Sequence, residues 1–144
     1  MPSLSSETMH ATCVLIHGSG VLIEGASGSG KSDLALRLID RGAKLVSDDY
    51  TFLQRQDGHL VASPPATIAG KIEVRELGIV DMAHVTSASV ALLVSLGEPP
   101  ARLPEPGQAR LLLGVEVPLV LLEGRDSSAP IKVELALARM EKAV

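Results

Sequence analysis

A glycine-rich segment near the start of the chain restricts the possible folds more than any other stretch. It fits the pattern G-x-x-x-x-G-K-[ST] at every fixed position and reads Gly25, Ala26, Ser27, Gly28, Ser29, Gly30, Lys31, Ser32. The glycines let the backbone curl, so that several N–H groups converge on the phosphates of a nucleotide. Lys31 supplies a mobile charge for the β- and γ-phosphate oxygens, and the Ser32 hydroxyl can ligate Mg²⁺. This phosphate-binding loop is the predicted nucleotide site.

The residues on either side of the loop strengthen this prediction. Val21, Leu22 and Ile23 precede it as a short apolar run that is typical of a strand. Residues 33–41 follow with apolar side chains four apart on one helical face, and Gly42 is a suitable helix stop. A helix that begins at the end of the loop adds the positive end of its dipole to the phosphate site. Strand, loop and helix together indicate nucleotide binding.

Length and composition limit the other possibilities. The chain has 144 residues, so we expect one domain over 1–144, with a flexible start over about 1–10. Tyr50 and Phe52 are its only aromatic residues, and its net charge is −4. Neighbouring aromatics of this kind cannot form an extended base-stacking surface, and the negative charge does not attract a phosphate backbone. We therefore expect no nucleic acid partner.

The sequence also predicts a cellular compartment. Cys13 is the single cysteine and lies in an apolar run, which indicates a buried core thiol in a reducing environment. Glu116 and Pro118 interrupt the most apolar stretch, residues 111–122, before it reaches membrane-spanning length. Residues 1–10 lack the basic start and apolar middle of a signal peptide. We expect a cytoplasmic protein that does not enter a membrane.

The absence of asparagine excludes two classes of phosphate-transferring protein. Ras-type GTPases read guanine with an Asn-Lys-x-Asp loop, and eukaryotic-type protein kinases need the asparagine of their catalytic loop for Mg²⁺. The sequence contains no asparagine at all, so neither element can exist here.

Local patterns predict a mixed sheet. We expect a tight turn at residues 18–20, a hairpin around Asp57-Gly58 and further strands and helices, namely strands 11–16, 21–24, 43–47, 88–96 and 115–122 and a final helix 131–142. Tight hairpins around a single strand–loop–helix unit indicate antiparallel as well as parallel pairing. The predicted fold class is α/β, a P-loop nucleotide-binding core with a mixed sheet and flanking helices.

Asp48 and Asp49 are the first candidates for chemistry. They follow the strand after the loop's helix, where acidic residues commonly reach the metal and the γ-phosphate. Two adjacent carboxylates in extended chain point to opposite sides, so one can face the metal while the other faces an incoming hydroxyl. The alternative is an acidic turn that leads into Tyr50.

A second charged stretch, residues 70–81, alternates charged and apolar side chains and by itself is equally typical of an exposed amphipathic strand. Taken with the preceding motifs, it resembles the catalytic domain of HPr kinase/phosphorylase. Members of that family phosphorylate and dephosphorylate a serine of a bacterial phosphocarrier protein. The matching motifs, in order, are His17-Gly18, Val21-Leu22-Ile23, the phosphate-binding loop, Arg41-Gly42, Leu45-Val46-Ser47-Asp48-Asp49, Ile72-Glu73-Val74-Arg75 and Leu77-Gly78-Ile79-Val80-Asp81. The match covers residues 12–81 and weakens afterwards.

The resemblance implies a fold related to HPr kinase and phosphoenolpyruvate carboxykinase, and a role for several residues. Asp49 matches the proton acceptor, which becomes the donor in the reverse reaction. Asp48 is its companion near the metal, and Glu73 matches a Mg²⁺ ligand beside Ser32. ATP and Mg²⁺ are the implied cofactors, and an HPr-type phosphocarrier is the implied partner.

Basic residues are implied as well. Arg75 lies in a segment that the family uses in both directions, Arg102 matches a catalytic arginine, and Arg125 lies in a segment tied to dephosphorylation. His17 matches a histidine assigned to the active site.

The chain departs from the family pattern at Glu76, where the family box usually has glycine. We expect a homo-oligomer. The family's extra N-terminal domain and C-terminal helices are not present in this sequence, so we leave the family's hexamer open. Two other functions stay open at this point. One is a metabolite kinase or carboxykinase-like enzyme, and the other is a nucleotide-responsive regulatory binding module.

Overall fold

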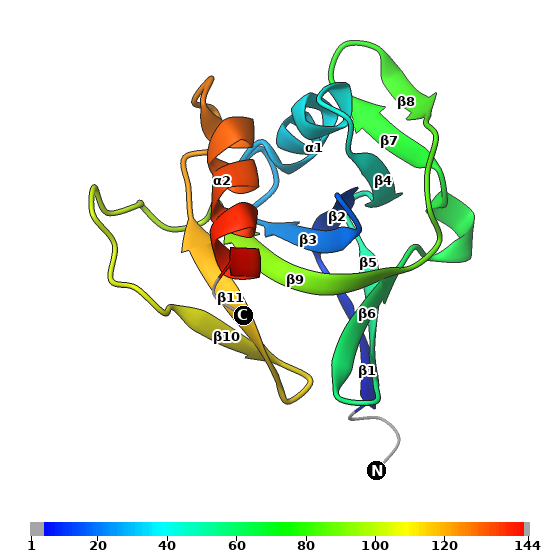
Figure 1. Ribbon diagram of the computed structural model, residues 1–144. Coiled ribbons are helices and arrows are strands. Elements are labelled where there is room, and N and C mark those ends of the chain that lie inside the picture. Colours follow the sequence, from blue (N-terminus) through cyan, green and yellow to red (C-terminus); the bar gives the residue numbers. More distant parts are fainter. Residues whose placement is uncertain (1–4, 143–144) are drawn as a thin grey trace.

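The computed structural model describes residues 5–142, and within them helices cover one face of a strongly curled mixed sheet (Figure 1). Figure 1 shows β1, β5 and β6 extending away from the helices, and the separate β7–β8 hairpin beside α1. The elements are β1 (Ser6–Met9), β2 (Ala11–Ile16), β3 (Ser19–Glu24), α1 (Lys31–Asp40), β4 (Lys44–Ser47), β5 (Thr51–Gln56), β6 (His59–Ser63), the 3-10 helix η2 (Ala66–Ile68), β7 (Lys71–Val74), β8 (Gly78–Asp81), β9 (Ala88–Ser95), β10 (Ala109–Leu112), β11 (Val115–Leu121) and α2 (Ala129–Lys142).

Strand β9 is the centre of the sheet, because it has neighbours along both edges. On one edge it runs parallel to β3. On the other edge its start pairs antiparallel with β6, through Ala88 and Ser89, and its end pairs parallel with β11. The pairings extend through β5 to β1 on one side and through β2 to β4 on the other. Parallel and antiparallel pairs thus occur in one sheet, as predicted.

The central strands have buried residues on both faces. Val21 and Ile23 of β3 face α1 and α2, where they join Leu34 and Leu38 of α1 in one apolar cluster. Leu22, between them, packs into a second cluster with residues of β5, β6 and β11. Because side chains alternate along a strand, a continuous apolar run is required where both faces are covered. Cys13 is fully buried in the second cluster, as the sequence indicated.

The hairpin of β2 and β3 turns one residue earlier than predicted. Ile16 pairs with Ser19, so the loop is His17-Gly18 and not residues 18–20. Both loop residues have positive φ, 48° and 82°, as a two-residue turn of the type that matches strand twist requires. The glycines around Ser19 signalled the turn correctly but not its register.

The flexible start is wrong for Ser6–Met9, which form β1. This strand pairs antiparallel with β5, from Ser6 opposite Gln54 to Met9 opposite Thr51. Its sequence is polar because it is an edge strand with side chains that are mostly half-exposed or exposed, so backbone hydrogen bonds rather than apolar burial hold it. Residues 1–4, also part of the predicted flexible start, lie outside the described residues.

The charged stretch around residues 70–81 forms a two-stranded hairpin of β7 and β8. A single exposed amphipathic strand was the alternative for this stretch in the sequence analysis. Its turn is closed by a hydrogen bond from Leu77 N–H to the Val74 carbonyl, 3.0 Å from N to O. Glu76 has φ 77° in this turn, in the left-handed region that favours glycine. That conformation fits the glycine that the resemblance implies at this position.

No helix in the described part of the chain is both long and apolar enough to cross a membrane.

Candidate active site

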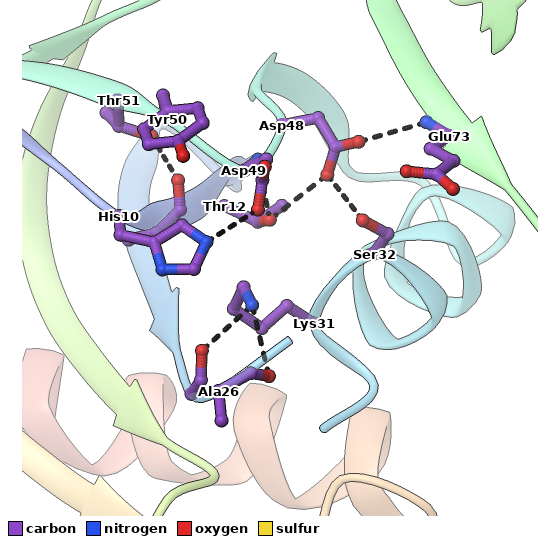
Figure 2. A network of polar contacts seen from close by, with 12 residues as sticks. His10, Thr12, Ala26, Lys31, Ser32, Asp48, Asp49, Tyr50, Thr51 and Glu73 are labelled. Atoms are coloured by element: carbon purple, nitrogen blue, oxygen red, sulfur yellow. Dashed lines mark hydrogen bonds and ion pairs between the residues drawn. The ribbon is translucent and has the colours of Figure 1, made fainter. Parts of the chain in front are cut away.

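The phosphate-binding loop connects the end of β3 to the start of α1 (Figure 2). Gly30 precedes the helix with φ 100°, a conformation that an L side chain adopts only at a cost. Lys31 is the first helical residue and is buried, and its Nζ donates to the carbonyl oxygens of Gly25 at 2.8 Å and Ala26 at 3.3 Å. The ammonium group therefore lies inside the curl of the loop, beside the position that phosphate oxygens occupy in such loops.

Asp48 is the buried anchor of the site. Its Oδ1 accepts hydrogen bonds from Ser32 Oγ at 2.6 Å and from Thr12 Oγ1 at 3.1 Å. Its Oδ2 accepts from the backbone N–H of Glu73 at 2.9 Å. Only 7% of Asp48 is exposed. One carboxylate thus ties together β2, the start of α1, and β7.

Asp49 has a different environment, although it is the next residue. Its φ of 67° lies in the left-handed region, and its backbone N–H donates to Thr12 Oγ1 at 3.1 Å. The side chain is half-exposed and lies 2.8 Å from Nε2 of His10, measured to Oδ1. Figure 2 shows Asp49 directed towards His10, while Asp48 is directed towards Ser32 and Glu73. The two carboxylates separate because of this turned backbone, and not because of the strand alternation used in the prediction.

An open cavity of about 510 Å³ lies between the loop, Asp49 and the β7–β8 turn. Most of the predicted site residues line this cavity, although they come from segments that are far apart in the sequence. Its lining residues are Ser27, Gly28, Gly30, Lys31, Ser32, Asp33, Leu36, Asp49, Glu73, Val74, Arg75, Glu76 and Arg125.

Arg125 reaches the cavity from the segment between β11 and α2. Its Nη2 donates to the carbonyl oxygen of Gly28 in the phosphate-binding loop. The segment around Arg125, to which the resemblance assigns a role in dephosphorylation, therefore lies beside the phosphate-binding loop.

His17 and Arg102 lie elsewhere. His17 is exposed in the turn of the β2–β3 hairpin, and the phosphate-binding loop follows the other end of β3. Arg102 is exposed in the proline-containing segment between β9 and β10, and the described residues that line the cavity do not include it.

His10 is a site residue that the sequence interpretation missed. It directly precedes β2, whose first residue, Ala11, pairs with Glu24, the last residue of β3. In an antiparallel hairpin the start of the first strand lies beside the end of the second, so the residue before β2 must lie near the phosphate-binding loop. The tyrosine after Asp49 lies close as well, with the rings of His10 and Tyr50 5.1 Å apart between centroids. The hairpin register was the signal that could have identified His10.

The oxygen atoms at this site suit a divalent cation. Ser32 and Glu73 both line the cavity, and the buried Asp48 Oδ1 lies 2.6 Å from Ser32 Oγ. Mg²⁺ in phosphate-transfer sites is bound by few protein oxygens together with substrate phosphates, and not by a cage of protein ligands alone. Among the described residues, no three or more His, Cys, Asp or Glu side chains are grouped so that they could hold a metal ion by themselves.

Comparison with known proteins decides the family. The model of the HPr serine kinase C-terminal domain matches residues 3–138. The chain belongs to this family. The HPr kinase/phosphorylase of Clostridium botulinum is 42% identical over 90 residues, and that of Clostridium tetani is 43% identical over the same length. Both alignments cover 62% of this chain but only 30% of the relative, so the match spans about a third of the length of these family members.

A solved structure, that of the Hpr(Ser) kinase/phosphatase from Coxiella burnetii, covers the chain more completely. It superposes with a TM-score of 0.82 at 33% sequence identity, over 95% of this chain and 91% of that one. The HPr kinase resemblance stated from the sequence is thereby confirmed, and so is the predicted α/β fold with its P-loop core and mixed sheet.

Proposed function

We propose that this chain is an ATP-dependent protein-serine kinase that acts on an HPr-type phosphocarrier protein. The names of its relatives, HPr kinase/phosphorylase and Hpr(Ser) kinase/phosphatase, support the reaction class and the substrate. One observation in the chain itself carries the proposal. Asp49 is a half-exposed carboxylate in the cavity, while Asp48 beside it is bound to Ser32 of the nucleotide loop. A base and a phosphate site are therefore adjacent and distinct.

In this proposal the loop N–H groups and Lys31 bind the ATP phosphates. Lys31 exchanges the carbonyl oxygens of Gly25 and Ala26 for phosphate oxygens, which are stronger acceptors because they are charged. Ser32, Asp48 and Glu73 are the residues that would hold Mg²⁺. When bound, the cation supplies positive charge that offsets the charge of the transferring phosphoryl group.

The chemical step needs a base and an aligned nucleophile. Asp49 accepts the proton of the substrate serine hydroxyl, and His10 holds the Asp49 carboxylate at 2.8 Å. The serine oxygen forms a bond to the γ-phosphorus while the bond to the bridging β,γ-oxygen breaks, so that ADP leaves. Arg75 and Arg125 line the same cavity and add positive charge where the phosphoryl oxygens pass.

The relatives' names also support a reverse activity. In that direction inorganic phosphate attacks the phosphorus of the phosphoserine, the bond to the serine oxygen breaks, and Asp49 returns a proton to that oxygen. The products are pyrophosphate and the unmodified carrier. We extend the proposal to a cytoplasmic location, since a phosphocarrier substrate is itself a cytoplasmic protein. We also propose that the chain forms a homo-oligomer.

The experiment that tests the proposal is incubation with γ-labelled ATP, Mg²⁺ and an HPr-type carrier, followed by mapping of the modified residue. Label on one carrier serine is the expected result. Label on a small molecule in the absence of any carrier would favour the metabolite kinase. ATP binding without transfer to either acceptor would favour the regulatory binding module.

A further inference from the structure

Arg37 of α1 contacts the backbone on both sides of Arg125. Its Nη1 donates to the carbonyl oxygen of Asp126 at 2.9 Å, and its Nη2 donates to the carbonyl oxygen of Gly124. Its Nε donates to Asp33 Oδ2 at 3.0 Å, one helical turn earlier. The planar guanidinium group thus uses all three nitrogens, and two of them hold the neighbours of one cavity residue.

Apart from the Arg125 side chain, the other polar contacts of residues 124–126 are with neighbouring residues of the chain. The Arg125 N–H donates to Glu123 Oε1 at 3.1 Å, the Asp126 carbonyl also accepts the Ala129 N–H at 3.0 Å, and Lys132 lies 3.6 Å from Asp126 Oδ2. Gly124 packs against Leu96 so closely that an added Cβ would lie 2.7 Å from that side chain. The N–H of Asp126 donates to the carbonyl of Glu123 at 3.2 Å, within the segment itself. The Arg125 side chain then extends to the phosphate-binding loop at Gly28. Its position over the loop depends on a backbone that Arg37 holds from α1.

We propose that Arg37 is a positioning residue, which fixes residues 124–126 so that Arg125 stays at the nucleotide phosphates. The inference rests on the proposed function, and it assigns to Arg37 a role that acts through Arg125. Helix α1 begins with Lys31 and carries Arg37 six positions later. One rigid helix therefore sets both cationic groups, Lys31 directly and Arg125 through the backbone, and any shift between them is limited.

Arg37→Ala removes both backbone contacts. We expect phosphoryl transfer to fall about 10-fold or more, because small misplacement of a charge-stabilising group is costly, with KM for ATP changed less than about 3-fold. Arg37→Lys is the second variant, since one ammonium group cannot bridge the two carbonyls as a guanidinium does, and an intermediate rate is expected. Wild-type rates in both variants would overturn the proposal.

Arg41→Ala is the matched control. Arg41 also lies next to α1 and forms an exposed ion pair at 2.7 Å, but with Glu134 of α2 and not with residues 124–126. Its loss removes an arginine contact of the same α1 region without touching residues 124–126, and we expect near wild-type transfer. A fall equal to that of Arg37→Ala would mean that general weakening of α1 explains both, and would reject the positioning role.

A double-mutant cycle with Arg125→Ala tests whether Arg37 acts through Arg125. If it does, Arg37→Ala lowers transfer in the wild-type background but has no further effect once Arg125 is alanine. An equal fall in both backgrounds would show independent roles and overturn the inference.

Hydrogen exchange of the amides in residues 124–129 gives a readout that needs no activity. Arg37→Ala is expected to speed this exchange several-fold, whereas Arg41→Ala leaves it unchanged. Absence of transfer in the wild-type chain would defeat the proposed function while the exchange result still decides the positioning role. Unchanged exchange in Arg37→Ala would defeat the positioning role by itself.

Discussion

At the residue scale, Asp48 and Asp49 have the same chemistry and different surroundings. Asp48 accepts three hydrogen bonds in a buried position, from Ser32, Thr12 and the Glu73 N–H. Asp49 is half-exposed and has His10 as its side-chain neighbour. Stability and catalysis should therefore depend on different members of the pair.

Asp49→Asn keeps the shape of the side chain but cannot accept a proton. We expect turnover to fall by about 10²- to 10⁴-fold, with ATP affinity and melting temperature near those of the wild type. Asp48→Asn places an N–H₂ group among donors, so we expect a loss of about 1–3 kcal/mol in unfolding free energy and a higher Mg²⁺ requirement. Denaturant unfolding and Mg²⁺ titrations of both variants check this, and a turnover defect without stability loss in Asp48→Asn would reverse the assignment.

His10→Ala removes the side chain that holds the Asp49 carboxylate. Without that contact the carboxylate samples more orientations, so we expect turnover to fall on the order of 10-fold while ATP affinity is retained. His17→Ala serves as the control, because His17 lies in the distant hairpin turn. Steady-state kinetics of the two variants measure the difference, and a larger defect in His17→Ala would restore the histidine implied by the sequence resemblance.

The thiol of Cys13 predicts a pH dependence. Burial raises the pKa of Cys13 from its ordinary value of 9.0 to about 12, because a thiolate is poorly solvated in the core. The unfolded chain therefore releases this proton first, and the contribution to stability, complete below pH 9, is lost as the pH rises towards 12. Denaturant unfolding between pH 8 and pH 11 should show a steeper decline in the wild type than in Cys13→Ala. Parallel declines would contradict the buried thiol as the cause.

At the scale of elements, the β7–β8 hairpin depends on one glycine. Gly70 precedes β7 with φ 75°, and its carbonyl oxygen accepts the N–H of Met82 at 2.8 Å. The hairpin in turn presents the Glu73 N–H to Asp48. The backbone conformation at Gly70 thus contributes to the site although the residue does not line the cavity.

Gly70→Ala should lower the unfolding free energy by about 1 kcal/mol or more, since an L side chain is strained at this φ and its Cβ would lie 2.7 Å from the His84 ring. Gly97→Ala is the control, because Gly97 lacks a positive φ and an added Cβ would only touch Ser95 Oγ, at the ordinary contact distance of 3.9 Å. Thermal unfolding of both variants compares the two positions. Equal stability of both variants would show that the hairpin tolerates the change.

Elements with strong local signals were predictable from the sequence. The apolar run of β9, the Asp57-Gly58 hairpin and the loop between β3 and α1 are all present. β1 was missed because an edge strand needs no apolar pattern, and the β7–β8 turn was missed because Glu76 occupies a position where glycine would have signalled it. Both misses concern backbone pairing, which side-chain patterns report only indirectly.

At the scale of the whole molecule, nucleotide binding should be linked to folding. The site combines residues of the phosphate-binding loop, α1, the turn after β4, β7 and the segment after β11, so it exists only in the folded chain. At about 100 times the dissociation constant, Mg²⁺-ATP should add about 2.7 kcal/mol to the unfolding free energy. Lys31→Ala should lose most of this gain, because the loop N–H groups alone do not offset the phosphate charge. Calorimetric melting of the wild type and of Lys31→Ala, with and without nucleotide, measures this stabilisation. Equal shifts in melting temperature in the two proteins would rule out the predicted role of Lys31.

The candidate site was predictable where function is encoded locally. Lys31 and Ser32 belong to a contiguous motif, and the cavity contains both. His10 and Arg37 required the sheet register and the course of the chain after β11, which no local pattern shows. His17 was implied only by the family resemblance, and the pairing of Ile16 with Ser19 places it in the hairpin turn, at the end of β3 away from the phosphate-binding loop.

The position of β9 in the chain has a consequence for synthesis on the ribosome. β3, which leads into the phosphate-binding loop, emerges early, but its parallel neighbour begins only at Ala88. Until that segment is made, one edge of β3 is unpaired. Pairing of that edge with β9 is a long-range contact, and such contacts form slowly. A nascent chain that stalls before Ala88 therefore exposes an apolar strand that can join a second copy, and rapid translation through residues 64–95 shortens that interval.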